Sequence, residues 1–120
     1  MVQSYRDLKV WQQAIDLVTA TYLLLKTFPK EEIYALASQI RRAAVSIPAN
    51  IAEGHARQHT KEFLQHLSIA KGSLAELDTL LIVAEKLSYV GSQEVAAIQA
   101  SIAEIRMMLC GLMSRLQSKL

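Results

Sequence analysis

The sequence predicts an all-α protein, specifically an antiparallel up-down-up-down four-helix bundle. Along four separate stretches, apolar residues recur at alternating steps of three and four, a spacing that gathers them on one face of a helix. Only two prolines and four glycines occur in 120 residues, so helix breakers are rare. The links between the stretches are short, and short links make successive helices antiparallel neighbours.

Length and composition place the chain in one domain, residues 1–120, with 52% hydrophobic residues to build a core. Charge is nearly balanced, with 13 basic and 11 acidic residues, and does not by itself demand a polyanionic partner. The single cysteine, Cys110, excludes an intramolecular disulfide and favours a reducing compartment, so we expect a cytoplasmic protein. The longest run without a charged residue, 43–52, is about half a membrane span, so no transmembrane helix is predicted.

The first helix is expected over residues 6–27. Ser4 and Asp7 resemble a weak capping box at its start, and the Phe28–Pro29 pair ends it. The predicted core seam is Leu8, Trp11, Ile15, Val18, Tyr22 and Leu25.

The second helix is expected over residues 30–53, because Pro29 suits a first turn and two glutamates follow near the positive helix end. Alanines beside the seam, Ala49 and Ala52 among them, suggest a second contact face. The predicted seam is Ile33, Leu36, Ile40, Ala44, Ile47 and Ile51.

Pro48 lies inside this second helix and cannot donate a hydrogen bond to the carbonyl of Ala44. Two outcomes are open: one kinked helix, or a break with Ser46 capping a new short helix. The unchanged apolar phase across the proline favours the kink. Asn50 is expected to bind a freed carbonyl or to reach a neighbouring helix, and Gly54 to take the left-handed position after the helix end.

The third and fourth helices are expected over residues 60–88 and 93–117, separated by a turn in which Gly91 stops one and Ser92 caps the next. Gly72, inside the third, is expected to admit a neighbouring side chain such as Trp11 or Tyr22. The two seams are Phe63, Leu67, Ala70, Leu74, Leu77, Leu81 and Ala84, then Val95, Ile98, Ile102, Ile105, Leu109, Leu112 and Leu116.

One segment is idiosyncratic: Ser46-Ile-Pro-Ala-Asn-Ile-Ala-Glu-Gly54. It resembles the signature of the bacterial four-helix-bundle family named for the intervening sequences in 23S ribosomal RNA genes. Stretches 7–11, 28–32 and 63–77 resemble the family as well, so the resemblance covers about residues 4 to 90, and the fourth helix matches only in pattern. The motif positions interpreted as structural are Ser46, Pro48, Asn50, Glu53 and Gly54.

The resemblance implies a fold and a mode of assembly, but no reaction. Members of this family form four-helix bundles that assemble into ring-shaped pentamers, and for most stand-alone members no biochemical activity is established. A more distant relative, the accessory variability determinant of diversity-generating retroelements, works with a reverse transcriptase and nucleic acid. We therefore expect a homo-oligomer, with a pentamer favoured, and an RNA, DNA or protein partner. Apolar residues in excess of the four seams agree with self-association.

Positive charge is concentrated between Gln39 and Lys71, where five basic residues face two acidic ones, while the rest of the chain has eight basic and nine acidic residues. Basic side chains neutralise phosphates, and because basic and aromatic residues do not alternate we expect contact with the backbone rather than base stacking. The alternative is a solvated face with ion pairs, such as Arg57 or Lys61 with Glu53. The candidate nucleic-acid-binding residues are Arg41, Arg42, Arg57, Lys61 and Lys71.

No catalytic residue, metal site or cofactor is predicted. His55 and His59 are four apart but fall in the expected link, and no His-Glu-x-x-His run or glycine-rich phosphate loop occurs. Cys110 is expected to pack as a small hydrophobe. The sequence therefore favours a non-enzymatic oligomeric bundle that binds nucleic acid, or a nucleic-acid-processing partner, through a basic surface. The alternative is a protein–protein interaction scaffold without a nucleic-acid role.

Overall fold

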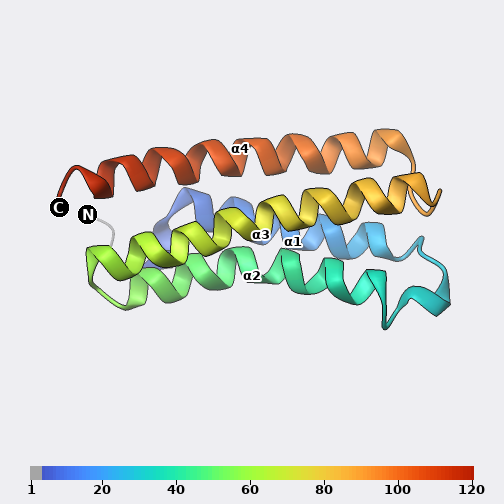
Figure 1. Cartoon of the computed structure of the whole chain (residues 1–120), viewed down its shortest axis with the longest axis horizontal. Coiled ribbons are helices and arrows are strands. Elements are labelled where there is room, and N and C mark those ends of the chain that lie inside the picture. Colours follow the sequence, from blue (N-terminus) through green and yellow to red (C-terminus); the bar gives the residue numbers. More distant parts are fainter. Residues whose placement is uncertain (1–3) are drawn as a thin grey trace.

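The computed structural model describes residues 4–120, and these fold into four α-helices with no strand. The helices are α1 (Lys9–Leu25), α2 (Leu36–Ala56), α3 (Thr60–Lys86) and α4 (Ser92–Gln117), with short 3-10 turns η1 (Tyr5–Asp7) and η2 (Lys30–Glu32) before α1 and α2. Successive helices run antiparallel in an elongated bundle of 46 × 23 × 20 Å (Figure 1). The predicted all-α four-helix bundle is confirmed.

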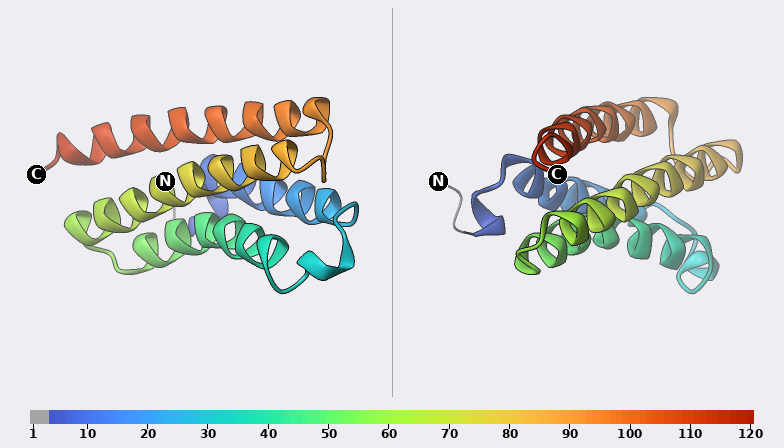
Figure 2. Two further views of the ribbon diagram at one scale, coloured as in Figure 1. Left: turned by 45° about the vertical axis from the view of Figure 1, so that its right-hand side comes forward. Right: turned by 60° about the vertical axis from the view of Figure 1, so that its left-hand side comes forward.

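Each helix packs against two others: α1 and α3 both contact α2 and α4. The most extensive contact joins α2 to α3. The α2–α3 link lies at one end of the bundle together with the C-terminus, and the other two links lie at the opposite end (Figures 1 and 2). The α2–α3 pair is therefore the best-packed half of the molecule, and the idiosyncratic motif lies within it.

The core seams predicted for α2, α3 and α4 are confirmed over most of their length. Fully buried positions come from each of these helices, whereas Ile33, which precedes α2, is 43% exposed. Helix α4 is long and apolar enough by length and composition to cross a membrane, and 28% of its most apolar window is buried in the bundle. The buried seam residues are Ile40, Ala44, Ile47, Ile51, Leu67, Ala70, Leu74, Leu77, Leu81, Ala84, Val95, Ile98, Ile102, Ile105 and Leu109.

The seam predicted for the first helix is wrong by one residue. Ile15 and Tyr22 are 38% and 44% exposed, and the buried face of α1 is one position earlier. That face includes Thr21, whose hydroxyl donates to the carbonyl of Leu17 at 2.7 Å, so its burial leaves no polar group unpaired. Of the other predicted seam residues, Leu25 is buried, and Leu8, Trp11 and Val18 are partly buried against the core. The observed buried positions are Val10, Ala14, Leu17, Thr21, Leu24 and Leu25.

Helix α2 begins at Leu36 rather than at residue 30 and ends at Ala56 rather than at 53. The residues before it form the η2 turn, after which Glu32 Oε1 accepts a hydrogen bond from the Leu36 backbone N–H at 3.2 Å. The helix continues through Pro48 without interruption, so Ser46 does not start a new helix. The alternative of a break is therefore wrong, and the favoured outcome of one continuous helix, which contains the whole motif, is confirmed. The other helices begin and end within three residues of their predicted bounds.

Two glycines behave differently from the prediction. Gly54 is buried inside α2, and none of the described glycines has a positive φ; the left-handed residue of this link is Gln58, with φ 63°. Gly72 is exposed on α3, and a Cβ added there would meet nothing within 4 Å, so it admits neither Trp11 nor Tyr22. The glycine that a neighbouring helix approaches closely is Gly54, where an added Cβ would meet side-chain atoms of α3.

Candidate functional site

A polar cluster joins the motif of α2 to α3. The Asn50 Nδ2 group donates to the Ser46 carbonyl at 2.8 Å and lies 3.0 Å from the Ser46 hydroxyl. The same hydroxyl lies 2.8 Å from the hydroxyl of Ser73 on α3. Of the two alternatives expected for Asn50, the contact with a neighbouring helix is made, to His66 of α3, whereas the carbonyl that it binds in its own helix is that of Ser46 and not the Ala44 carbonyl freed by Pro48. The cluster fastens the two helices through their side chains.

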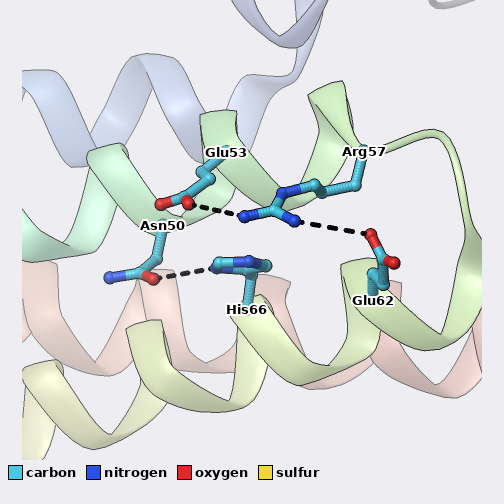
Figure 3. Close-up of polar contacts among 5 residues, drawn as sticks. All are labelled: Asn50, Glu53, Arg57, Glu62 and His66. Atoms are coloured by element: carbon cyan, nitrogen blue, oxygen red, sulfur yellow. Dashed lines mark hydrogen bonds and ion pairs between the residues drawn. The ribbon is translucent and has the colours of Figure 1, made fainter.

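His66 completes this cluster from α3, with its Nδ1 atom 3.1 Å from Asn50 Oδ1 (Figure 3). Because an amide oxygen only accepts, the Nδ1 atom of His66 carries the proton in this arrangement. The His66 Cβ would lie 2.6 Å from a Cβ added at Gly54, and Phe63 Cδ1 would lie 3.1 Å from it. Gly54 therefore provides the room in which His66 reaches Asn50.

The structural interpretation of the motif follows from these contacts. Pro48 is buried in α2, and its ring nitrogen cannot donate to the Ala44 carbonyl. Ser46 and Asn50 bind across the α2–α3 contact, and Gly54 lets α3 come close. The side chains of Ser46, Pro48 and Asn50 thus make their contacts within the protein, and Gly54 contributes by having no side chain. Ser46, Asn50 and Gly54 lie at the contact between α2 and α3, and the motif is interpreted as structural.

Arg57, a candidate phosphate ligand, is held between two carboxylates near the α2–α3 link. Its guanidinium lies 3.2 Å from Glu53 Oε2 and 3.9 Å from Glu62 Oε2 (Figure 3). The ion pair with Glu53 is the one that the alternative interpretation named. The three side chains are about half exposed, so each pair contributes little to stability. The pairing nevertheless neutralises Arg57, which leaves less positive charge at this end for phosphates.

Arg41 and Arg42 lie in the second turn of α2, beside α1. Arg41 Nη2 donates to the Ile33 carbonyl at 2.8 Å, and Arg42 Nη1 donates to the Ser38 hydroxyl at 3.3 Å. Arg41 is half-buried and Arg42 is exposed. Neither partner is a carboxylate, so these hydrogen bonds do not offset the positive charge of either guanidinium group.

These arginines line a groove between α1 and α2, hereafter the α1–α2 groove, which consists of two adjoining hollows of about 490 and 420 Å³. Tyr22 and Arg41 line both hollows. Within residues 4–120, no carboxylate is among the lining side chains. The groove therefore combines an apolar floor, three cationic side chains and one tyrosine. Its lining is Val18, Thr19, Tyr22, Leu23, Leu25, Lys26, Ser38, Arg41, Arg42, Val45 and Ser46.

The five candidate basic residues do not form one continuous patch. Arg57 follows Arg42 by about 22 Å along α2, and Lys61 is exposed in the first turn of α3. Lys71 shares a helical face with Asp78, which accepts a hydrogen bond from Gln99 of α4 at 2.9 Å, so Lys71 lies toward α4. Arg41 and Arg42 lie together in α2, whereas Arg57 and Lys61 flank the α2–α3 link.

The structure adds Lys26 and Tyr22 of α1 to this pair of arginines, and sequence reasoning missed both. Tyr22 was assigned to the core because the α1 seam was placed one residue too late. The signal that could have found them is their spacing of four residues, which puts them on one helical face.

A sequence model of the family described as "23S rRNA-intervening sequence protein" matches residues 6–111. The chain belongs to this family. The match extends through most of α4, beyond the part that the residue-by-residue resemblance covered. A comparison with curated proteins gives no match.

A solved relative shows the same fold. It is a protein of unknown function from the S23 ribosomal protein family of Bacteroides thetaiotaomicron VPI-5482, with a crystal structure at 1.70 Å resolution. The two chains superpose with a TM-score of 0.80 at 23% sequence identity, over 87% of this chain and 97% of the other. This intervening-sequence family protein therefore shares its fold with that relative.

The histidines and the cysteine of this family member take up separate positions. No group of three His, Cys, Asp or Glu side chains within residues 4–120 could hold a metal ion. His55 packs edge-on against Phe63, with ring centroids 5.6 Å apart, while His59 is exposed before α3. Cys110 is exposed on α4, so the expectation that it packs as a small hydrophobe is wrong.

Proposed function

We propose that this intervening-sequence family protein is a non-enzymatic, self-associating helical bundle, most simply a pentamer, that binds nucleic acid through the α1–α2 groove. The observation that carries the proposal is the convergence of Lys26, Arg41 and Arg42 on one groove whose described lining contains no carboxylate. Clustered cations of this kind neutralise backbone phosphates and release their counterions. Whether the nucleic acid is presented alone or by a nucleic-acid-processing protein, these cations would meet its phosphates.

Apolar side chains on the surface support the self-association half of the proposal. On α1, Ile15 is 38% exposed and lines neither hollow of the α1–α2 groove. On α4, Met107 is 73% exposed. A ring requires two different contact faces on each subunit, and exposed apolar side chains on more than one helix are candidates for them. A ring would also repeat the groove around its axis, so that weak single contacts add up to useful avidity.

The test is binding of labelled RNA and DNA across a salt series, with the mass of the protein measured in parallel. We compare Arg41→Ala/Arg42→Ala with Lys61→Ala/Lys71→Ala, which removes the same charge away from the groove. The groove variant should bind more weakly, and its slope of log affinity against log salt should fall by up to about two. Circular dichroism checks the fold of the groove variant, since Arg41 also binds the Ile33 carbonyl.

Three results would decide against parts of the proposal. Absence of binding at low salt by a fully assembled oligomer would remove the nucleic-acid role. Equal losses in the two charge-matched variants would remove the groove as its location. A monomer mass at micromolar concentration would remove self-association.

A protein-interaction scaffold without a nucleic-acid role is the second candidate. The observation that favours it is a set of exposed apolar residues on α3 that do not line the α1–α2 groove: Ile69 at 49%, Ile82 at 40% and Val83 at 40%. Single exposed apolar residues are common, but several on one helix are typical of contact surfaces. This interpretation predicts an assembled oligomer that binds neither RNA nor DNA at any salt concentration.

A further inference from the structure

We propose that Tyr22 is a stacking platform for an unpaired base, so that the α1–α2 groove takes single-stranded rather than double-stranded nucleic acid. This inference rests on the proposed function and names the class of its ligand. From the sequence, we expected contact with the nucleic-acid backbone rather than base stacking, because basic and aromatic residues do not alternate along the chain. The inference replaces that expectation. The helices bring together what the sequence keeps apart, because Tyr22 on α1 and Arg41 on α2 share the groove.

The position of Tyr22 suits a stacking role. Its side chain lines both hollows of the groove and so separates them, and the residue is 44% exposed. Tyr5 and Tyr89 each pack against another aromatic ring, Trp11 and Phe28 respectively, whereas Tyr22 belongs to none of the ring pairs found in residues 4–120. A flat base therefore has open space beside the Tyr22 ring.

The charges around Tyr22 suit the phosphates of a strand whose base is stacked there. Arg41 lines both hollows, and its bond to the Ile33 carbonyl at 2.8 Å holds the guanidinium at a fixed place. Lys26 lines the first hollow, and Arg42 lines the second. A strand that occupies either hollow thus meets Tyr22 and two cationic side chains.

Single strands are favoured because their bases can leave the stack. A duplex buries its base faces between neighbouring pairs, whereas a single strand offers a π-face of any base to an aromatic side chain. Recognition of this kind tolerates any sequence, because every base has such a face. The groove is predicted to prefer unpaired strands without reading their sequence.

The experiment measures the affinity of the full-length protein for three probes at one low salt concentration: an oligothymidine, an abasic strand of equal length, and a duplex of equal length. The variants are Tyr22→Phe, Tyr22→Leu and Tyr22→Ala. Tyr34→Ala serves as a matched control, because Tyr34 is 94% exposed and lines neither hollow. The mass of every variant is measured alongside.

The wild-type protein should bind oligothymidine about tenfold more tightly than the abasic strand, as expected for one stacked base. Tyr22→Leu and Tyr22→Ala should abolish that difference and leave the affinity for the abasic strand unchanged. Tyr22→Phe should preserve the difference, because it keeps the ring, and Tyr34→Ala should behave as the wild type.

Each contrary outcome has its own meaning. Equal affinity of the wild type for the oligothymidine and the abasic strand, or tighter binding of the duplex, would overturn the stacking role while leaving the proposed function in place. Loss of the oligomer in Tyr22→Leu and Tyr22→Ala would make Tyr22 a subunit contact, and it would overturn the stacking role as well. No binding of any probe would overturn the proposed function itself.

Discussion

Asn50 Oδ1 on α2 accepts a hydrogen bond from His66 Nδ1 on α3 at 3.1 Å, and the amide nitrogen of the same Asn50 donates to the Ser46 carbonyl at 2.8 Å. The Asn50 side chain thus forms hydrogen bonds with its own helix and with the neighbouring helix at the same time. Both residues are half-buried, where an amide that lost its partners would regain only part of its hydration. The pair explains why a polar residue occupies the most extensive helix–helix contact of the bundle.

We predict that Asn50→Ala lowers the free energy of unfolding by about 1–3 kcal/mol, because the His66 ring nitrogen and the Ser46 hydroxyl lose a partner at a half-buried contact. Urea denaturation followed by circular dichroism measures the change. Gln65→Ala, an exposed change on α3, should alter stability by less than about 0.5 kcal/mol. Equal stability of Asn50→Ala and Gln65→Ala would show that the bond to His66 contributes nothing.

The two serines of the cluster should differ in their effect on stability. Ser73→Ala removes one hydroxyl, but the Ser46 hydroxyl keeps its contact with Asn50 at 3.0 Å. Ser46→Ala removes a partner from Ser73, which is 8% exposed, and from Asn50. We expect a cost of about 1 kcal/mol for Ser73→Ala and more for Ser46→Ala. The reverse order in thermal or urea denaturation would contradict the assigned network.

The fold was predictable from the sequence where a helix carries a single apolar stripe. In helices α3 and α4, most of the predicted seam residues are buried, and the others, Phe63, Leu112 and Leu116, are partly buried against the core. Helix α1 has two overlapping stripes, and the buried one contains Thr21, a residue that counts as polar until its bond to Leu17 is known. Apolar periodicity alone cannot choose between them, because the choice depends on how α1 fits the other helices.

The start of α2 and the candidate site could not be predicted from the sequence for a related reason, because both depend on contacts between residues far apart in the chain. Glu32 caps α2 and also accepts a hydrogen bond from Tyr89, which lies 57 residues later. Arg41 and Tyr22 share a groove only because α1 turns its second stripe toward α2. In contrast, the Glu53–Arg57 pair has a spacing of four residues, and such a local contact could be anticipated.

Glycine-to-alanine changes at two positions should have opposite signs. At Gly54, the new Cβ would lie 2.6 Å from the His66 Cβ, so α3 must shift away; overpacking of this kind costs about 1–3 kcal/mol. At Gly72, a new Cβ meets nothing within 4 Å, and alanine is the better helix former by about 1 kcal/mol. We expect Gly54→Ala to destabilise the bundle and Gly72→Ala to stabilise it, as measured by urea denaturation. A stabilised Gly54→Ala variant would mean that α2 and α3 are not held at this separation.

The Tyr89 hydroxyl donates to Glu32 Oε2 at 2.8 Å and so joins the α3–α4 turn to the η2 turn. This hydrogen bond, with smaller effects of burial and of the nearby Glu32 and Glu31 charges, raises the pKa of Tyr89 above its ordinary value of 10.0. The neutral phenol is thus favoured by folding. Its contribution to stability is complete below about pH 10 and is lost as the pH rises through the higher folded-state pKa.

Tyr89→Phe tests this linkage, because phenylalanine keeps the ring packed against Phe28, at a centroid distance of 5.5 Å, and removes only the hydroxyl. The variant should unfold at a lower temperature than the wild type at pH 8. The gap between the two should narrow above pH 10, where the wild type loses the contribution of Tyr89. Comparing the two proteins at each pH cancels the titration of the other tyrosines and of the lysines. A gap that stays constant from pH 8 to pH 11 would mean that the Glu32 contact does not disfavour the ionised form of Tyr89.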